Sequence, residues 1–168
     1  ISTGNQPMRS FYEIPSEVLD HTYINQLMAA GYQVSAKYKQ DFNFEQRHWK
    51  KLKGNLKQDW GKIPDGKPFF IVRNYAESHE SRAFTDEKKP VKTDPATMSL
   101  HAYHPDLPAI RQSYARYSDT VANMDKRIGE NIAWLKKTGQ YENTIIIYCS
   151  DHGGVMPRSK RFMYNSGT

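Results

Sequence analysis

The chain has 168 residues, 38% of them hydrophobic and 12% aromatic, which is enough for one compact domain with a buried core and excludes a disordered tail. Its 24 lysines and arginines exceed its 18 acidic residues, and the net charge of +6 favours an anionic partner. The single cysteine excludes a disulfide framework within the chain, and every apolar run is too short to span a membrane.

The first predicted element is one amphipathic helix over residues 16–30. Pro15 and Ser16 suit its start, and Gly31 suits a C-terminal cap. Its apolar positions fall on one helical face: Val18, Leu19, Tyr23, Leu27 and Met28. Residues 31–44, which follow the helix, are predicted to be irregular.

Most of the positive charge lies in residues 35–62, where eight lysines and arginines stand against three acids. Five aromatic residues are interleaved with them, a pattern that also occurs in grooves for single-stranded nucleic acid. No helix-turn-helix, zinc-finger or RNA-motif signature accompanies it. We therefore interpret the stretch as a solvated basic surface over a few core aromatics, and we expect no nucleic-acid partner.

A turn signal, Pro64-Asp65-Gly66, precedes a short apolar and aromatic run at residues 67–75, which predicts a buried strand. The strand ends in the polar sequence AESHES, residues 76–81. Residues 82–104 are rich in charge and proline and are predicted to form a long loop.

The most regular pattern predicts a long helix, preceded by Asp106 and Pro108 and followed by Gly139. Apolar residues recur in it at spacings of three and four: Ile110, Tyr114, Tyr117, Val121, Met124, Ile128, Ile132 and Leu135. The sequence NTIIIYC, residues 143–149, then predicts a second buried strand. Helix, short loop and apolar strand together indicate an α/β fold with a mainly parallel sheet.

Both predicted strands are followed by a histidine, His79 after the first and His152 after the second. Ligands of open α/β sheets bind beyond the carboxyl ends of the strands, so we expect these ends to converge on a site. The alternative is that each histidine is a hydrogen-bonded turn residue. Arg158, Lys160 and Arg161 follow closely and suit an anionic substrate, with a solvated basic loop as the alternative.

Asp151 and His152 supply an oxygen and a nitrogen donor suited to a metal ion. Two ligands are too few for a closed site, so either no metal binds or the other ligands lie outside the chain. Ser150, Asp151 and His152 do not suit a hydrolase triad, because successive side chains of an extended backbone point to opposite faces. Cys149 ends the apolar run and is expected to pack in the core.

The segment NTIIIYCSDHGGVMPRSKRFMYNSG, residues 143–167, resembles the sulfatase family of the alkaline phosphatase superfamily. In that family a long helix leads to NT, a buried strand, SDHG and then P-R-x-K-R-x-x-Y. Residues 31–44 resemble the family's G-Y segment that leads to a catalytic lysine, and residues 67–82 resemble its strand that ends in H-E-S-R. With MRS at residues 8–10, the resemblance covers nearly the whole chain.

The resemblance implies an α/β fold with a mainly parallel central sheet flanked by helices. It implies that Asp151 and His152 are ligands of a divalent metal, usually calcium in this family, although many members have Asn where His152 stands. Lys39 falls on the lysine that binds the sulfate and the nucleophile. His79 would contact the sulfate ester, and Lys160 would hold a sulfate oxygen or protonate the leaving group.

The nucleophile of the family is a formylglycine made from Cys or Ser in C-x-P-x-R or S-x-P-x-R, and neither motif occurs here. Cys149 lacks both the proline and the arginine of that motif. We therefore expect residues 1–168 to be an internal part of the large N-terminal sulfatase domain. The formylglycine and an acidic pair would lie upstream, the C-terminal subdomain downstream, and the fragment alone would be inactive.

The implied activity is hydrolysis of sulfate esters or sulfamates, with a sulfated small molecule or glycan as substrate. The family suggests a periplasmic, extracellular or lysosomal-type compartment. Two alternatives remain open. One is a phosphate or phosphonate ester hydrolase of the same superfamily, and the other is a non-catalytic, anion-binding homologue.

Overall fold

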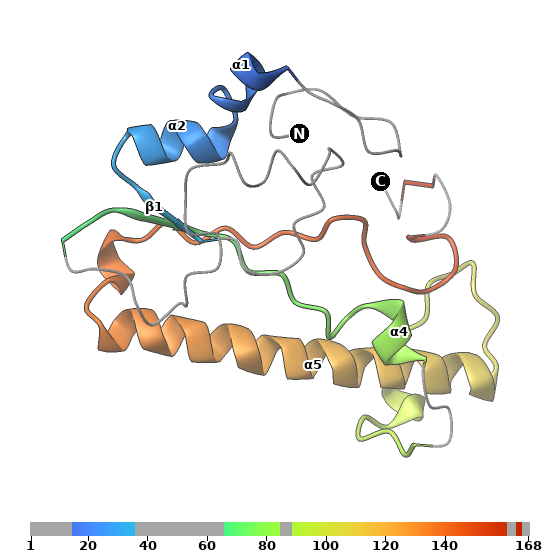
Figure 1. The fold of residues 1–168 in the computed structure, drawn as a ribbon. Coiled ribbons are helices and arrows are strands. Elements are labelled where there is room, and N and C mark those ends of the chain that lie inside the picture. Colours follow the sequence, from blue (N-terminus) through green and yellow to red (C-terminus); the bar gives the residue numbers. More distant parts are fainter. Residues whose placement is uncertain (1–14, 36–65, 85–88, 161–163, 166–168) are drawn as a thin grey trace. The chain divides into compact units, whose positions relative to one another are not determined.

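The structure is a computed structural model that describes residues 15–35, 66–84, 89–160 and 164–165. The chain divides into two compact units, Ile1–Asn74 and Tyr75–Thr168. Figure 1 labels the helices and strands of both units. None of the helices in the described ranges is both long enough and apolar enough to cross a bilayer.

The first unit contains two short helices and two short strands. They are α1 (Ser16–Leu19), α2 (Tyr23–Ala29), β1 (Gln33–Ser35) and β2 (Phe69–Ile71). The two strands pair in parallel, with Val34 opposite Phe70, as an α/β fold requires. The buried side chains of Leu19, Ile24 and Val34 form the centre of this unit's core.

The prediction of one helix over residues 16–30 is wrong, because the helix breaks after Leu19. The carbonyl oxygen of Leu19 accepts hydrogen bonds from the Thr22 hydroxyl at 2.8 Å and the Asn25 amide at 2.7 Å. Thr22 has extended backbone and starts α2. These side chains compete with the helical ladder and divide the helix in two.

The predicted end of this helical region is confirmed. Gly31 has φ +88°, its N–H donates to the Met28 carbonyl, and the Tyr32 N–H donates to the Leu27 carbonyl. This is the Schellman arrangement, in which glycine takes the left-handed conformation that other residues adopt at a cost.

The prediction that residues 31–44 are irregular is wrong for β1, and the rest of that range from residue 36 lies outside the described residues. The strand predicted at residues 67–75 is confirmed in part, as the shorter β2. Tyr23 packs edge-on against Phe70, with ring centroids 5.7 Å apart, and so ties α2 to β2.

The second unit is built on one long helix. It contains α4 (Glu80–Ala83), the 3-10 turns η2 (Pro95–Thr97) and η3 (Tyr141–Asn143), and α5 (Pro108–Lys137). The predicted long helix is thus confirmed, with Pro108 at its first position. Gly139 follows it with φ +70°, and the Gln140 N–H donates to the Leu135 carbonyl, which repeats the Schellman end of α2.

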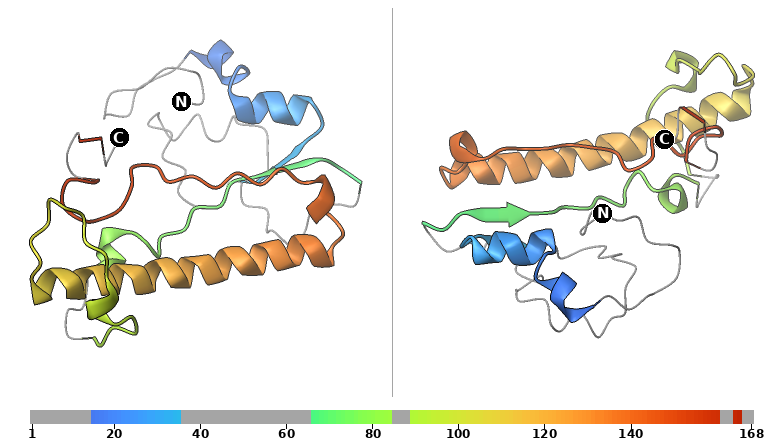
Figure 2. Two further views of the ribbon diagram at one scale, coloured as in Figure 1. Left: turned by 180° about the vertical axis from the view of Figure 1, so that it is seen from behind. Right: turned by 90° about the horizontal axis from the view of Figure 1, so that it is seen from above.

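The strand predicted at residues 143–149 is wrong for the structure described. Residues 144–150 run without sheet pairing, and Ile145 and Ile147 are 90% and 83% exposed. This segment and the residues after it return alongside α5 in the opposite direction (Figures 1 and 2). A strand needs a neighbour for its N–H and C=O groups, and the sheet in the described residues consists of β1 and β2.

Candidate functional site

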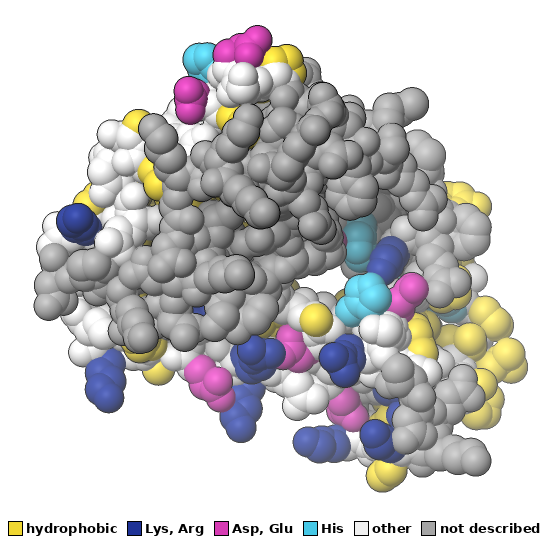
Figure 3. Space-filling view, viewed as in Figure 1, with side chains coloured by type: hydrophobic (Ala, Val, Ile, Leu, Met, Phe, Trp, Pro, Cys, Tyr) yellow, Lys and Arg dark blue, Asp and Glu magenta, His cyan; other side chains and the backbone are white. Residues whose placement is uncertain are grey.

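His79 and Lys160, which the resemblance links to the sulfate and the leaving group, lie in contact. Nε2 of His79 is 3.2 Å from Nζ of Lys160, although 81 positions separate them in the chain. An oxygen of Glu80 lies 4.0 Å from the same Nζ. Figure 3 shows histidine, basic and acidic side chains gathered on this face of the described residues. The segment after β2 and the segment after residue 150 therefore meet through His79 and Lys160. The predicted convergence is of two strand ends carrying His79 and His152, and the second of those strands is not formed.

His79 is held by the start of the short helix α4. It is the N-cap residue, its Nδ1 accepts the backbone N–H of Ser81 at 3.2 Å, and the Ser81 hydroxyl lies 2.8 Å from the same nitrogen. Because Nδ1 is an acceptor, a neutral His79 ring carries its proton on Nε2. Sequence reasoning missed Ser81, because histidine is not among the residues preferred at an N-cap and so no local signal marked this helix start.

The hydrogen-bond roles at this contact suit an anion. In this tautomer His79 Nε2–H and the Lys160 ammonium are both donors, 3.2 Å apart, and the Glu80 carboxylate lies 4.0 Å from Nζ of Lys160. In the other tautomer Nε2 accepts a hydrogen bond from Lys160. An anionic oxygen placed against both nitrogens would accept from each. The pair is therefore an arrangement that can bind an oxyanion or deliver a proton to it.

Lys160 extends from a tightly folded loop. Its N–H donates to the Gly154 carbonyl at 3.3 Å, and the Ser159 N–H donates to the Met156 carbonyl at 3.1 Å. Three residues of this loop are themselves buried: Val155, Met156 and Ser159. Burial and backbone hydrogen bonds together fix the position from which the Lys160 side chain reaches His79.

Arg158 stands in the same loop with the left-handed φ of +69°. Its guanidinium carbon lies 4.6 Å from the ring centroid of Tyr103 and 4.3 Å from that of Tyr164. Such cation–π contacts help to offset the cost of a left-handed backbone at a residue with a Cβ. Arg158 therefore links this loop to the segment that precedes α5.

Asp151 and His152 contact each other in a bend. Oδ2 of Asp151 lies 3.2 Å from Nε2 of His152, so the expectation that adjacent side chains point apart is wrong here. Nδ1 of His152 is buried and has no hydrogen-bond partner among the described residues. Oxygen and nitrogen donors this close together fit two ligands of one divalent ion. Within the described ranges no third acidic, histidine or cysteine ligand completes such a group.

Three other expectations about site residues have different outcomes. Lys39 and Arg161 lie outside the described residues. Cys149 is exposed, so the prediction that it packs in the core is wrong. Its side chain follows the unpaired segment at residues 144–148 and therefore has no sheet to bury it.

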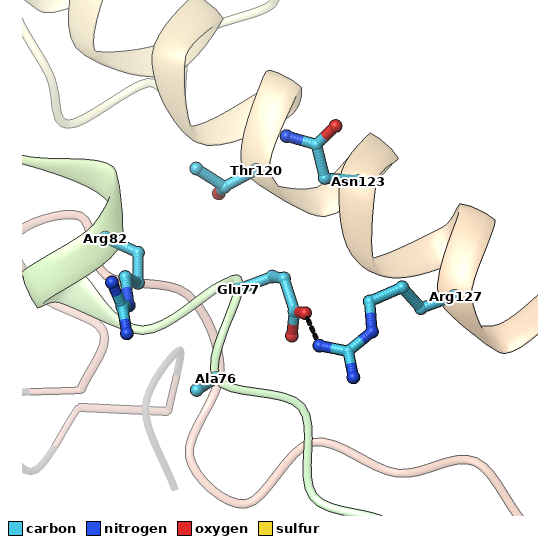
Figure 4. Close-up of a pocket in the computed structure, with 6 residues that line it drawn as sticks. All are labelled: Ala76, Glu77, Arg82, Thr120, Asn123 and Arg127. Atoms are coloured by element: carbon cyan, nitrogen blue, oxygen red, sulfur yellow. Dashed lines mark hydrogen bonds and ion pairs between the residues drawn. The ribbon is translucent and has the colours of Figure 1, made fainter.

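A polar cavity of about 380 Å³ lies between the segment before α4 and the middle of α5 (Figure 4). The residues that line it are Ala76, Glu77, Arg82, Thr120, Asn123 and Arg127. Glu77 and Arg127 form an ion pair across it. Burial acts to raise the pKa of Glu77. The hydrogen bond and charge of Arg127, together with hydrogen bonds from the backbone of Glu77 and Ala76, outweigh burial and lower the pKa. Sequence reasoning missed this cavity, because no local pattern joins residues 50 positions apart.

Comparison with known proteins gives a family match along nearly the whole chain. A family model described as Sulfatase matches residues 3–167. An ulvan-active sulfatase of Formosa agariphila is 25% identical, over 84% of this chain and 30% of that protein. The human N-sulphoglucosamine sulphohydrolase is 30% identical over 47% of this chain and 16% of its own length.

A third relative, the N-acetylglucosamine-6-O-sulfatase of Bacteroides thetaiotaomicron, is 43% identical over 32% of this chain and 10% of that protein. The chain thus spans less than a third of the length of each of these relatives. No solved structure gives a significant match.

Proposed function

Since the chain belongs to the sulfatase family, we propose that the protein containing it hydrolyses sulfate esters or sulfamates of a carbohydrate. The names of the three relatives support a sulfated glycan or amino sugar as the substrate class. The proposal includes the mainly parallel central sheet of the family, of which β1 and β2 would form part.

The observation that carries the proposal is the contact between His79 and Lys160, at 3.2 Å. In a sulfate ester, negative charge lies on the oxygens bound to sulfur, and more develops on the alcohol oxygen as its bond to sulfur breaks. Two N–H donors that converge on one point would hold a sulfate oxygen and stabilise this charge. Lys160 or His79 would then give a proton to the departing alcohol.

The donor atoms of Asp151 and His152 would hold a divalent metal together with ligands outside the described residues. We propose calcium, as in the family, although the imidazole departs from the oxygen donors that calcium prefers. The metal would supply Lewis-acid polarisation of the sulfate. Lys39, which follows β1 in the chain, would also bind the sulfate. A formylglycine outside this chain would be the nucleophile.

The test compares leaving groups in the protein that contains this chain. We expect Lys160→Ala to lower kcat for a sugar sulfate by about 10²- to 10⁴-fold, because a sugar alkoxide needs a proton to leave. The loss of kcat should be much smaller with 4-nitrophenyl sulfate, since nitrophenolate is a good leaving group and needs no proton to depart. Steady-state kinetics with both substrates measure the difference.

Lys137→Ala, which removes an exposed cation at the end of α5, is the matched control. Unchanged turnover of the sugar sulfate by Lys160→Ala would remove Lys160 from the mechanism. Turnover of a phosphate monoester without any sulfatase activity would replace the proposal by the phosphate ester hydrolase. Sulfatase activity of the 168-residue chain alone would contradict the expectation that its nucleophile lies elsewhere.

A further inference from the structure

The cavity between α4 and α5 is chemically matched to a ligand with both acidic and hydroxyl groups. Its walls carry two guanidinium groups, one carboxylate, one amide and one hydroxyl (Figure 4). The residues come from two segments, 76–82 and 120–127, which belong to the same compact unit. The volume of about 380 Å³ is in the range of small-molecule sites.

The charge of the cavity favours an anion. Glu77 and Arg127 neutralise each other as an ion pair. Arg82, from α4, lies on the other side of Glu77 from Arg127 and adds one positive charge (Figure 4). A guanidinium group presents a planar fork of N–H donors that matches a carboxylate or a sulfate.

The wall groups that a ligand hydroxyl could meet lie on α5. Oε1 of Glu77 accepts from Arg127, and Oε2 is buried out of reach of the cavity. Thr120 already donates its hydroxyl hydrogen to the Tyr117 carbonyl, at 2.7 Å, so it can only accept. Asn123 offers both a donor and an acceptor.

The cavity adjoins the candidate reaction site along the chain. His79 lies between the lining residues Ala76 and Arg82, and its N–H donates to the Ala76 carbonyl at 3.1 Å. Arg82, Asn123 and Arg127 are exposed, so the cavity is open enough to hold one unit of a longer chain.

We propose that this cavity is a subsite for an acidic sugar unit of the glycan substrate. The acid group of that unit is a carboxylate or a second sulfate. The acid group pairs with Arg82, one ring hydroxyl donates to the Thr120 oxygen, and Asn123 binds a further hydroxyl. The inference rests on the proposed function for its substrate class, and it adds a specificity-determining role for Arg82.

The kinetic test uses Arg82→Gln in the protein that contains this chain, with Lys126→Gln, an exposed cation on α5 outside the cavity, as control. Two sulfated disaccharides are compared, one with a uronic acid next to the sulfated unit and one with a neutral sugar there. We expect Arg82→Gln to raise KM about ten-fold more for the acidic disaccharide than for the neutral one, since about 1.4 kcal/mol of charged hydrogen bonding is lost. Lys126→Gln should leave this ratio as in wild type. An equal change for both disaccharides would overturn the subsite.

A binding test separates this inference from the proposed function. Free glucuronic acid is titrated into the protein, and the shift of the Asn123 side-chain amide is followed by NMR. Binding that Arg82→Gln weakens about ten-fold and Lys160→Ala leaves unchanged supports the cavity even if no sulfate ester is turned over. Equal binding of inorganic sulfate and glucuronic acid would show a plain anion site and overturn the role of the ring hydroxyls. Turnover with no glucuronic acid binding would overturn the inference and leave the proposed function standing.

Discussion

Gly153 and Gly154 stand together in the bend after Asp151 and His152, but the backbone makes different demands on them. Gly153 has φ +76°, and its N–H donates to the Ser150 hydroxyl at 3.0 Å. At Gly154 the backbone lies outside the left-handed region, and an added Cβ would be 3.5 Å from the Tyr117 ring, an ordinary contact. Only Gly153 therefore needs the conformational freedom of glycine.

We expect Gly153→Ala to destabilise the protein by about 1–2 kcal/mol, because a Cβ is unfavourable in the left-handed conformation. Gly154→Ala should change stability by less than about 0.5 kcal/mol, since it fits beside Tyr117 and also reduces the entropy of the unfolded chain. Urea unfolding of the two variants measures the contrast. Equal losses would mean that the bend does not depend on the φ of Gly153.

At the scale of elements, α5 orders the long irregular segment that precedes it. Asp119 accepts the N–H of Lys92 at 2.7 Å, the N–H of Thr93 at 3.1 Å and the Thr93 hydroxyl at 2.7 Å. Arg111 donates to the carbonyls of Pro95, Ala96 and Met98. The prediction of a long loop is confirmed for most of the described part of residues 82–104, and this loop is tied to one face of α5.

We expect Asp119→Asn to lower the free energy of unfolding at pH 7 by about 1–3 kcal/mol, because three hydrogen bonds lose a charged acceptor. Burial acts to raise the pKa of Asp119. The hydrogen bonds from the Lys92 N–H and from the N–H and hydroxyl of Thr93, together with the charge of Lys92, outweigh burial and lower the pKa. A pKa that is lower in the folded state stabilises the protein above the ordinary aspartate range. That stability is lost as the pH falls through the folded-state pKa.

Chemical denaturation between pH 7 and pH 3 tests this, with Asp125→Asn, an exposed carboxylate on the same helix, as control. The wild type should lose more stability than Asp119→Asn over that range. Parallel curves for the two proteins would show that Asp119 does not carry the pH dependence.

At the scale of the whole molecule, Asp151 and His152 lie in contact, and the described residues contain no group of three or more side chains that could hold a metal ion. If the proposed metal binds the folded protein alone, it stabilises that state by mass action. We expect removal of metal with EDTA to lower stability by about 2.7 kcal/mol relative to calcium at 100 times its Kd. Calorimetry of the protein that contains this chain measures the shift in Tm.

The variant Asp151→Asn with His152→Ala should unfold at the same temperature with and without EDTA. An unchanged EDTA effect in that variant would exclude both residues as ligands. Replacing calcium by zinc tests which metal binds, because an imidazole nitrogen favours zinc over calcium.

Local signals predicted α5 and its ends, because a period of 3.6 residues, a proline at the start and a glycine at the end act within a few turns. They also indicated His79 and Lys160 as candidate site residues, and the family resemblance supplied the roles proposed for them. They did not predict β1, the break at Thr22 or the cavity around Glu77. In each of these the deciding partner lies elsewhere in the fold or is a side chain that competes with the backbone.

The sequence by itself determined which residue types follow each apolar run and where the long helix begins and ends. Only the tertiary structure decided that His79 and Lys160 meet at 3.2 Å, that residues 144–148 run unpaired, and that Arg82 and Arg127 flank one cavity. The physical reason is the distance along the chain over which each interaction acts. Capping and periodicity depend on neighbours within four residues, whereas strand pairing and side-chain contacts depend on parts of the chain that folding brings together.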